Sequence, residues 1–315
     1  MFQSHDRKSL LNRNQKAGFT LIELLITISI IAVLASIILP AVNGARRAAR
    51  VAAVRAEMAE IAQALDQFKA EFGMYPPSSI TLYETAADWN INDAVHKKNK
   101  FLVSKLWPDY DFATRDLDGD GTAGEEIVLQ PAECLVFFLG GPTILDTSIN
   151  KFTPLGFAND PTNPFNLTSK SRKAPYFKFD ISRLRDGANA NNLPAYIDNY
   201  PEQELPILYF SGNGSAGYDH DQVVATGLLD VYRQSWTLGT TATATFDPSS
   251  TNVKTWNDST FQLISPGPDK QYGIGGYFAS GMAQPSPVPA AWGDFNSRRQ
   301  PDIDNITNFH NSELR

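Results

Sequence analysis

The longest apolar run of the chain lies near its N-terminus, from Phe19 to Val42, and reads FTLIELLITISIIAVLASIILPAV. Its only charged residue is Glu23. A helix of about 24 residues, at 1.5 Å per residue, is roughly 36 Å long, which is enough to cross a hydrocarbon core of about 30 Å. An ordinary secretory signal has a shorter apolar run with small residues at its far end, whereas Ala17 and Gly18 stand at the near end here. The pattern therefore predicts a membrane-spanning helix over residues 19–42.

An apolar stripe continues beyond this span. Its members recur three or four residues apart, at Val51, Val54, Met58, Ile61, Leu65, Phe68 and Phe72. Charged residues fill the other faces, so residues 43–75 are predicted to continue the helix in amphipathic form, with the stripe packed on a folded head. Gly73 and Pro76 end the helical pattern. Pro40, late in the span, removes one backbone hydrogen bond and is expected to bend or loosen the helix.

After Pro77 the helical period fades, and aromatic and β-branched runs alternate with clusters of glycine, proline and asparagine. The runs 206–210 and 261–264 are the clearest predicted strands. The expected fold class is α+β, with a long N-terminal helix, a small antiparallel β-sheet and long loops. A chain of 315 residues is long enough to bury a substantial core, and residues 76–315 are assigned to one globular head.

Charge separates the two ends of the chain. Four basic residues and one acidic residue precede residue 18, so this segment has a net charge of about +3. Because the whole chain has a net charge of −7, the remainder has a net charge of about −10. A negative chain of this kind argues against broad binding of nucleic acid, which needs a basic face. It suits a soluble acidic domain or one that binds divalent cations.

Cys134 is the only cysteine, so no intramolecular disulfide can form. It stands in the apolar run 134–138, where a thiol is expected to be a small core residue rather than a nucleophile. No grouping of residues in the sequence supports nucleophilic catalysis, and the chain is not expected to be an enzyme.

Glu23 is costly inside an apolar helix unless its carboxylate finds a partner, and position alone leaves two alternatives, a functional acid or a tolerated residue near the membrane interface. The surrounding residues, Lys16-Ala17-Gly18-Phe19-Thr20-Leu21-Ile22-Glu23, resemble the cleavage motif of type IV pilins and type II secretion pseudopilins. Pro40 also matches that class.

The resemblance implies a processing pathway. The basic leader, residues 1–18, would be cleaved after Gly18 by a prepilin peptidase that also methylates the new N-terminal Phe19. Glu23 would pair with the terminal amine of the neighbouring subunit during assembly; a buried carboxylate and a buried ammonium are tolerable together, so the pair can specify axial register. Basic residues on both sides of the span leave the positive-inside rule undecided, and the motif itself places the leader in the cytoplasm.

An acidic loop is the first candidate for metal binding. Asp116, Asp118 and Asp120 stand at alternate positions, with Gly121 where a calcium loop turns sharply. Three carboxylates spaced in this way can converge on one hard cation. An EF-hand would need an acid at Ile127, and Glu125 and Glu126 fall just short of it. The alternatives are a structural Ca²⁺ site and a plain acidic surface turn.

The second candidate lies near the C-terminus, where residues 261–276 and 304–309 resemble the closing loop of major pseudopilins. The resemblance implies a structural Ca²⁺ site, with these residues as ligands: Asp269 and Asp304 through their side chains, and the region of Ile264 and Gly267 through backbone carbonyls. Residues 277–301 look like an insertion relative to that family, which leaves Asp302 as a rival to Asp304. The competing interpretation is a glycine- and proline-rich loop held by hydrogen bonds.

Within this class the sequence is most like a major pseudopilin with an enlarged head. The implied protein is a single-pass subunit of the bacterial inner membrane with a periplasmic head, assembled into a periplasmic pseudopilus. Its expected partners are copies of itself, other pseudopilins, the prepilin peptidase and an inner-membrane assembly platform, with no nucleic acid. A minor subunit near the filament tip, a type IV pilus pilin for adhesion or motility, and a membrane-anchored periplasmic enzyme or binding protein are the alternatives.

Overall fold

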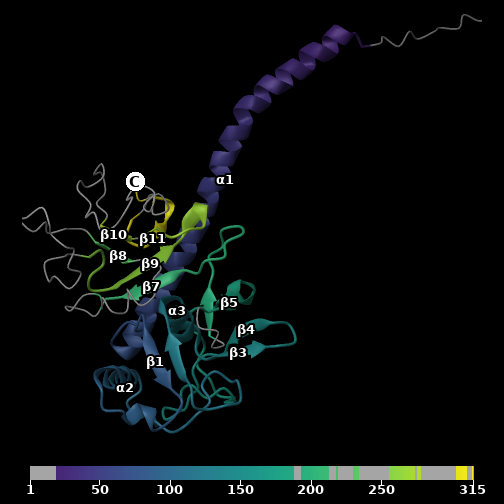
Figure 1. Ribbon diagram of the computed structural model, residues 1–315. Coiled ribbons are helices and arrows are strands. Elements are labelled where there is room, and N and C mark those ends of the chain that lie inside the picture. Colours follow the sequence, from purple (N-terminus) through teal and green to yellow (C-terminus); the bar gives the residue numbers. More distant parts are fainter. Residues whose placement is uncertain are drawn as a thin grey trace, which may run out of the picture. The chain divides into compact units, whose positions relative to one another are not determined.

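The computed structural model describes residues 19–187, 193–212, 218, 230–233, 255–273, 275–277, 303–310 and 314. The chain divides into two compact units, Met1–Ala48 and Ala49–Arg315. The elements, coloured along the sequence in Figure 1, begin with helix α1 (Leu21–Phe72) and continue as short strands and helices, so the α+β class with a long N-terminal helix is confirmed. The predicted boundaries at residues 18 and 42 concern processing and membrane depth, and they stay predictions.

The described part of the first unit, residues 19–48, belongs almost wholly to α1 and has no buried side chain. Phe19 and Leu21 are each 81% exposed. The helix continues through Pro40 without interruption. Ser29 and Ser36 turn their hydroxyls back onto backbone carbonyls of the preceding turn, at 2.7 Å each, which satisfies these polar groups within the helix. By length and composition, this helix can cross a membrane.

In the second unit, α1 buries the middle of the stripe that the sequence predicts, while Val51 and Phe72 at its two ends are half-buried. The buried side chains are Val54, Met58, Ile61, Ala64, Leu65 and Phe68. Burying a large apolar side chain contributes about 2 kcal/mol relative to leaving it exposed, so this row is a main attachment of the helix to the head. The helix ends at Phe72, and Gly73 follows with φ +74°, a left-handed conformation that favours glycine.

Two further helices lie where the sequence interpretation saw the helical period fade, and that interpretation is wrong there. Helix α2 spans Ala94–Leu106 and is capped by Asp93, whose carboxylate accepts the N–H of His96 at 2.9 Å. Helix α3 spans Pro131–Gly140, and all ten of its residues are buried. The period is obscured in α2 because its buried face includes Asn99, and in α3 because the whole helix is surrounded by protein.

The strands are short. They are β1 (Ile80–Tyr83), β2 (Glu126–Leu129), β3 (Thr143–Asp146), β4 (Lys151–Pro154), β5 (Leu184–Asp186), β6 (Pro194–Tyr196), β7 (Leu208–Ser211), β8 (Asp230–Arg233), β9 (Phe261–Ser265), β10 (Gly275–Tyr277) and β11 (Ile306–Thr307). Single turns of 3₁₀ helix are η1 (Asp88–Asn90), η2 (Ile181–Arg183) and η4 (Gly267–Asp269). Both strands predicted most clearly are present, as β7 and β9.

Strand β9 is the centre of a three-stranded antiparallel sheet, with β7 on one side and β11 on the other (Figure 1). The other described strands pair two by two: β1 with β2, β3 with β4, and β5 with β6 are antiparallel, while β8 and β10 are parallel. All five residues of β9 are buried, so this strand is covered on both faces.

Helix α3 lies at the centre of the head's core, in contact with β6 and β7 and also with β2 and β4. Cys134 is fully buried in it, and burial raises the pKa of its thiol well above the usual value. A thiol held in its neutral form is a poor nucleophile. The prediction that Cys134 is a small core residue is therefore confirmed.

Candidate functional site

The N-terminal site is built by the first turn of α1. Thr20 is the residue before the helix, and Glu23 lies in its first turn. The Oε2 atom of Glu23 accepts the backbone N–H of Thr20 at 2.9 Å and its hydroxyl at 2.7 Å, while the backbone N–H of Glu23 donates to the Thr20 hydroxyl at 3.3 Å. This reciprocal pattern is a capping box, which satisfies backbone donors that no helical turn precedes.

The capping box uses only one carboxylate oxygen of Glu23. In the described chain, Oε1 of Glu23 has no hydrogen-bond partner, although Oε2 accepts both bonds from Thr20. Glu23 therefore has a local structural role and still offers an acceptor for a cationic partner. Phe19 precedes it and is exposed, and Gly18 lies outside the described residues.

The acidic loop is organised by Glu84, a residue that follows β1 and is 1% exposed. Its Oε1 atom accepts the N–H of Leu117 at 2.7 Å, and its Oε2 atom accepts the N–H groups of Gly124 and Glu125 at 3.0 and 3.3 Å. The backbone of Glu84 also pairs with that of Arg115 and Glu125. One buried carboxylate thus holds both ends of the loop.

The aspartates of the loop converge with Glu84. Carboxylate oxygens of Glu84, Asp116 and Asp118 lie within 4.8 Å of one another, and so do those of Asp118, Asp120 and Glu125. Oxygens bound to one Ca²⁺ at about 2.4 Å lie at most about 4.8 Å apart, so either set has the spacing and the hard donors that Ca²⁺ prefers. The two sets share Asp118.

Asp118 is 5% exposed, and burial raises the pKa of its carboxyl to about 6, with the charges of Asp120, Glu84 and Asp116 adding to the effect. The hydrogen bond that Asp118 accepts from the N–H of Asp120, at 3.1 Å, lowers this pKa but only partly offsets the increase. A negative charge is therefore unfavourable at this position unless a cation compensates it.

The C-terminal loop brings two of its predicted ligands together. The backbone N–H of Asp269, in η4, donates to the carboxylate of Asp304 at 3.1 Å. Gly267 has φ +69°, and a Cβ there would come within 2.0 Å of the Asp304 carbonyl oxygen, so the two segments are packed backbone to backbone. Asp302 lies outside the described residues.

Backbone groups of the predicted C-terminal site already have protein partners. Ile264 lies in the central strand β9, opposite Leu208 and Thr307. The carbonyl of Gly267 accepts the N–H of Lys270 at 3.3 Å and the side-chain amide of Gln203 at 3.4 Å.

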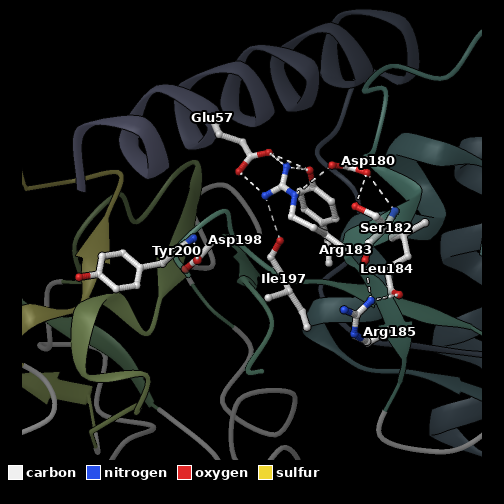
Figure 2. Close-up of polar contacts among 10 residues, drawn as sticks. Glu57, Asp180, Ser182, Arg183, Leu184, Arg185, Ile197, Asp198 and Tyr200 are labelled. Atoms are coloured by element: carbon white, nitrogen blue, oxygen red, sulfur yellow. Dashed lines mark hydrogen bonds and ion pairs between the residues drawn. The ribbon is translucent and has the colours of Figure 1, made fainter. Parts of the chain in front are cut away.

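Asp198 supports the same loop from 67 residues away in the sequence. It is 2% exposed, it accepts the hydroxyl of Ser265 and the N–H of Tyr200, the latter at 2.7 Å, and Ser265 in turn accepts the N–H of Gly267 at 3.2 Å. Figure 2 shows Asp198 beside Tyr200. Burial raises the pKa of Asp198.

Sequence reasoning missed both Glu84 and Asp198. For Glu84 a signal existed, because a single acid directly after an apolar strand, with no basic residue near it in the sequence, is a candidate for a buried acceptor. For Asp198 there was none, since its partner Ser265 is brought to it only by the folded loop.

A family model described as the prokaryotic N-terminal methylation motif matches residues 13–39. This stretch includes Gly18, Phe19 and Glu23 and most of the apolar run. No curated protein and no solved structure matches the chain. The evidence for the class therefore lies in the N-terminal segment, where the motif and the apolar helix of a membrane-anchored pilin-like protein coincide. The chain carries this motif, which supports the type IV pilin-like class that includes pilins and pseudopilins.

Proposed function

We propose that the chain is a structural subunit of a periplasmic pseudopilus of a type II secretion system. The prepilin peptidase cleaves it after Gly18 and methylates Phe19, and the mature subunit polymerises with copies of itself and with other pseudopilins on an inner-membrane platform. The observation that carries this proposal is the methylation motif over residues 13–39, which coincides with an exposed apolar helix. Since the motif is that of filament subunits, we infer a structural role rather than an enzymatic one.

The pairing of Glu23 with the terminal ammonium of the next subunit is supported by the geometry of the first turn. Oε2 of Glu23 is held by Thr20, which fixes the carboxylate at the start of the helix, and Oε1 remains for the incoming group. In the hydrocarbon, the carboxylate and the ammonium are each costly when alone, and together they select one axial register.

Intact-mass and N-terminal peptide analysis of the membrane-extracted protein, expressed with a prepilin peptidase, tests the processing. A chain that begins at N-methylated Phe19 is the expected result. A retained leader, or a cut beyond Val42, would sink the filament proposal in favour of an anchored enzyme or binding protein.

The site of filament growth then separates a pseudopilus from a type IV pilus. Filaments reconstituted with a type II assembly platform and confined to the periplasm are expected. Surface filaments formed only with a type IV pilus platform would assign the chain to adhesion or motility.

We further propose that the acidic loop binds a structural Ca²⁺ through Asp116, Asp118 and Asp120, with Glu84 as an additional carboxylate. Two observations support this: the carboxylate oxygens of Glu84, Asp116 and Asp118 lie within 4.8 Å of one another, as do those of Asp118, Asp120 and Glu125, and charge on Asp118 is unfavourable without a cation. The second proposed site, at Asp269 and Asp304, is supported by the contact between these two residues and by the family resemblance of the loop. The acidic loop has the larger set of converging carboxylates.

Asp118→Asn should raise the melting temperature of the calcium-free protein by about 2–4 °C, because it removes an unfavourable buried charge of the order of 1 kcal/mol. The same change should abolish the stabilisation that calcium gives to the wild type. The pKa of Asp118 in the fold, about 6, lies above its ordinary value, so this carboxyl favours the fold below about pH 4 and loses that contribution as the pH rises through 6.

Differential scanning calorimetry in EDTA and in calcium, at pH 4.5 and pH 7, measures both effects. The gain of the Asn variant over wild type should be larger at pH 7. Lower stability of the variant in EDTA at pH 7 would mean that the loop is a plain acidic turn whose hydrogen bonds need the carboxylate.

Asp269→Ala should lower the melting temperature by several degrees when calcium is present and by about 1 °C in EDTA. In EDTA the change removes the exposed bond that Asp269 accepts from the Gln271 N–H at 2.9 Å, which is worth about 0.5 kcal/mol. Asp258→Ala, another exposed acid of this unit, is the matched control and should respond equally in both buffers. Equal losses in the two buffers for Asp269→Ala would remove the C-terminal calcium site.

A further inference from the structure

A groove of about 500 Å³ runs between the second half of α1 and the segment 176–180. It lies wholly within the second unit and apart from both acidic sites. Its size falls in the range of about 300–1,000 Å³ that small-molecule sites occupy.

Part of the lining of the groove is a polar cluster, shown in Figure 2. Both terminal nitrogens of Arg183 donate to the carboxylate of Glu57, Nη1 at 2.8 Å, and Nη1 also donates to the carbonyl of Ile197 at 3.2 Å. Tyr196 donates its hydroxyl to Glu57 at 2.7 Å. Burial and the bond to Glu57 raise the pKa of that tyrosine, so its hydroxyl stays protonated. With their charges mutually satisfied, these side chains form a fixed wall rather than a free binding group.

The α1 wall carries free polar side chains in a row. Glu60, Gln63 and Gln67 are spaced by three and four residues and therefore lie on one face of the helix. Each is exposed, and none has a hydrogen-bond or ion-pair partner among the residues that the structure describes. Two amides and one carboxylate offer alternating donors and acceptors along about two turns of a rigid helix.

The opposite wall is aromatic. Tyr176 and Phe177 are half-buried, and their rings are fixed: Tyr176 donates its hydroxyl to Glu71, and Phe177 packs edge-on against Phe179 with ring centroids 4.8 Å apart. Lys178 adds an exposed ammonium, which likewise has no partner in the described chain. Aromatic side chains thus line the same groove as the row of amides.

We infer that this groove binds a neutral saccharide of a few sugar units. A sugar ring has C–H faces that pack on aromatic surface and rim hydroxyls that each donate and accept, which matches the two walls. The charges of the lining nearly cancel, with three acids and two bases, so neither a phosphate nor a polycation is favoured. A peptide could also bond to the amides, and the experiment below distinguishes it.

Saturation-transfer NMR on the full, processed chain in nanodiscs tests the inference with cellotriose, maltotriose, chitotriose and mannotriose, and with the peptide Ala-Gln-Ala as comparison. At least one trisaccharide should bind, and Gln63→Ala/Gln67→Ala should weaken that binding at least about tenfold through two lost hydrogen bonds. Lys105→Ala, an exposed change on α2, should leave it unchanged.

Because Gln63 and Gln67 are exposed and have no hydrogen-bond partner among the described residues, the double variant should keep its melting temperature; Glu60→Ala serves as a second variant if it does not. Absence of trisaccharide binding, or equal binding by the double variant, overturns the inference. Glutamine-dependent binding of the peptide alone also overturns it and assigns the groove to a peptide.

Discussion

Glu23→Ala should leave membrane insertion and leader cleavage intact and reduce filament yield at least about 100-fold. The missing carboxylate leaves the terminal ammonium of the next subunit without a counter-charge in the hydrocarbon, at a cost of several kcal/mol per subunit. Since each subunit added to a filament meets this cost, growth should stop rather than slow. Electron microscopy and sheared-filament yield, with mass analysis of the membrane fraction, measure the two halves of the prediction.

The capping box supplies the matched control. Thr20→Ala removes the cap that Glu23 shares and should cost about 1 kcal/mol of helix stability, yet it keeps the carboxylate. Filaments should therefore survive in Thr20→Ala. If Thr20→Ala and Glu23→Ala reduce filaments equally, Glu23 acts only as a helix cap and the pairing mechanism is wrong.

Glu84→Ala should destabilise the head by about 3 kcal/mol, or roughly 6–12 °C in melting temperature, even without calcium. The backbone N–H groups of Leu117, Gly124 and Glu125 would lose the buried carboxylate that accepts a hydrogen bond from each of them. For a domain with a total stability of about 5–15 kcal/mol, this is a large share. Calorimetry in EDTA isolates the effect from metal binding.

Glu126→Ala is the control for Glu84→Ala, because it removes the same charge from the exposed face of β2. Its melting temperature should stay within about 1–2 °C of wild type, as expected for a surface change. In calcium at 100 times the dissociation constant, the wild type should gain about 2.7 kcal/mol and Glu84→Ala much less. A Glu84→Ala protein as stable as wild type in EDTA would contradict the role given to this carboxylate.

The long helix could be predicted from the sequence because each of its features is local. The span is a continuous apolar run, and the stripe from Val54 to Phe68 has the helical period that burial on one face imposes. Helix α2 could not be read in this way, since Asn99 occupies its buried face and bonds to the Tyr83 hydroxyl at 3.1 Å, a contact that only the folded head provides. The hydrophobic pattern of a sequence reveals buried positions that carry apolar side chains, and it misses buried positions that carry polar ones.

The candidate sites differ in the same way, because some of their residues are close in the sequence and others are brought together only by the fold. The spacing of Asp116, Asp118 and Asp120 is visible in the sequence, but the three do not form one set: Asp116 and Asp118 converge with Glu84, and Asp118 and Asp120 converge with Glu125. Asp269 and Asp304 were paired by family resemblance, and they meet because the two segments pack backbone to backbone at Gly267. Glu84 reaches the acidic loop across 33 residues, which no spacing rule anticipates.

The second neighbour of the central strand β9 is β11, a strand of two residues near the end of the chain. If β11 detached, the buried strand Phe261–Ser265 would present a bare row of N–H and C=O groups on that side. Such an exposed edge can pair with an extended segment of another polypeptide chain by β-strand addition. Ile306 and Thr307 therefore protect the head against strand exchange and aggregation, in addition to completing its sheet.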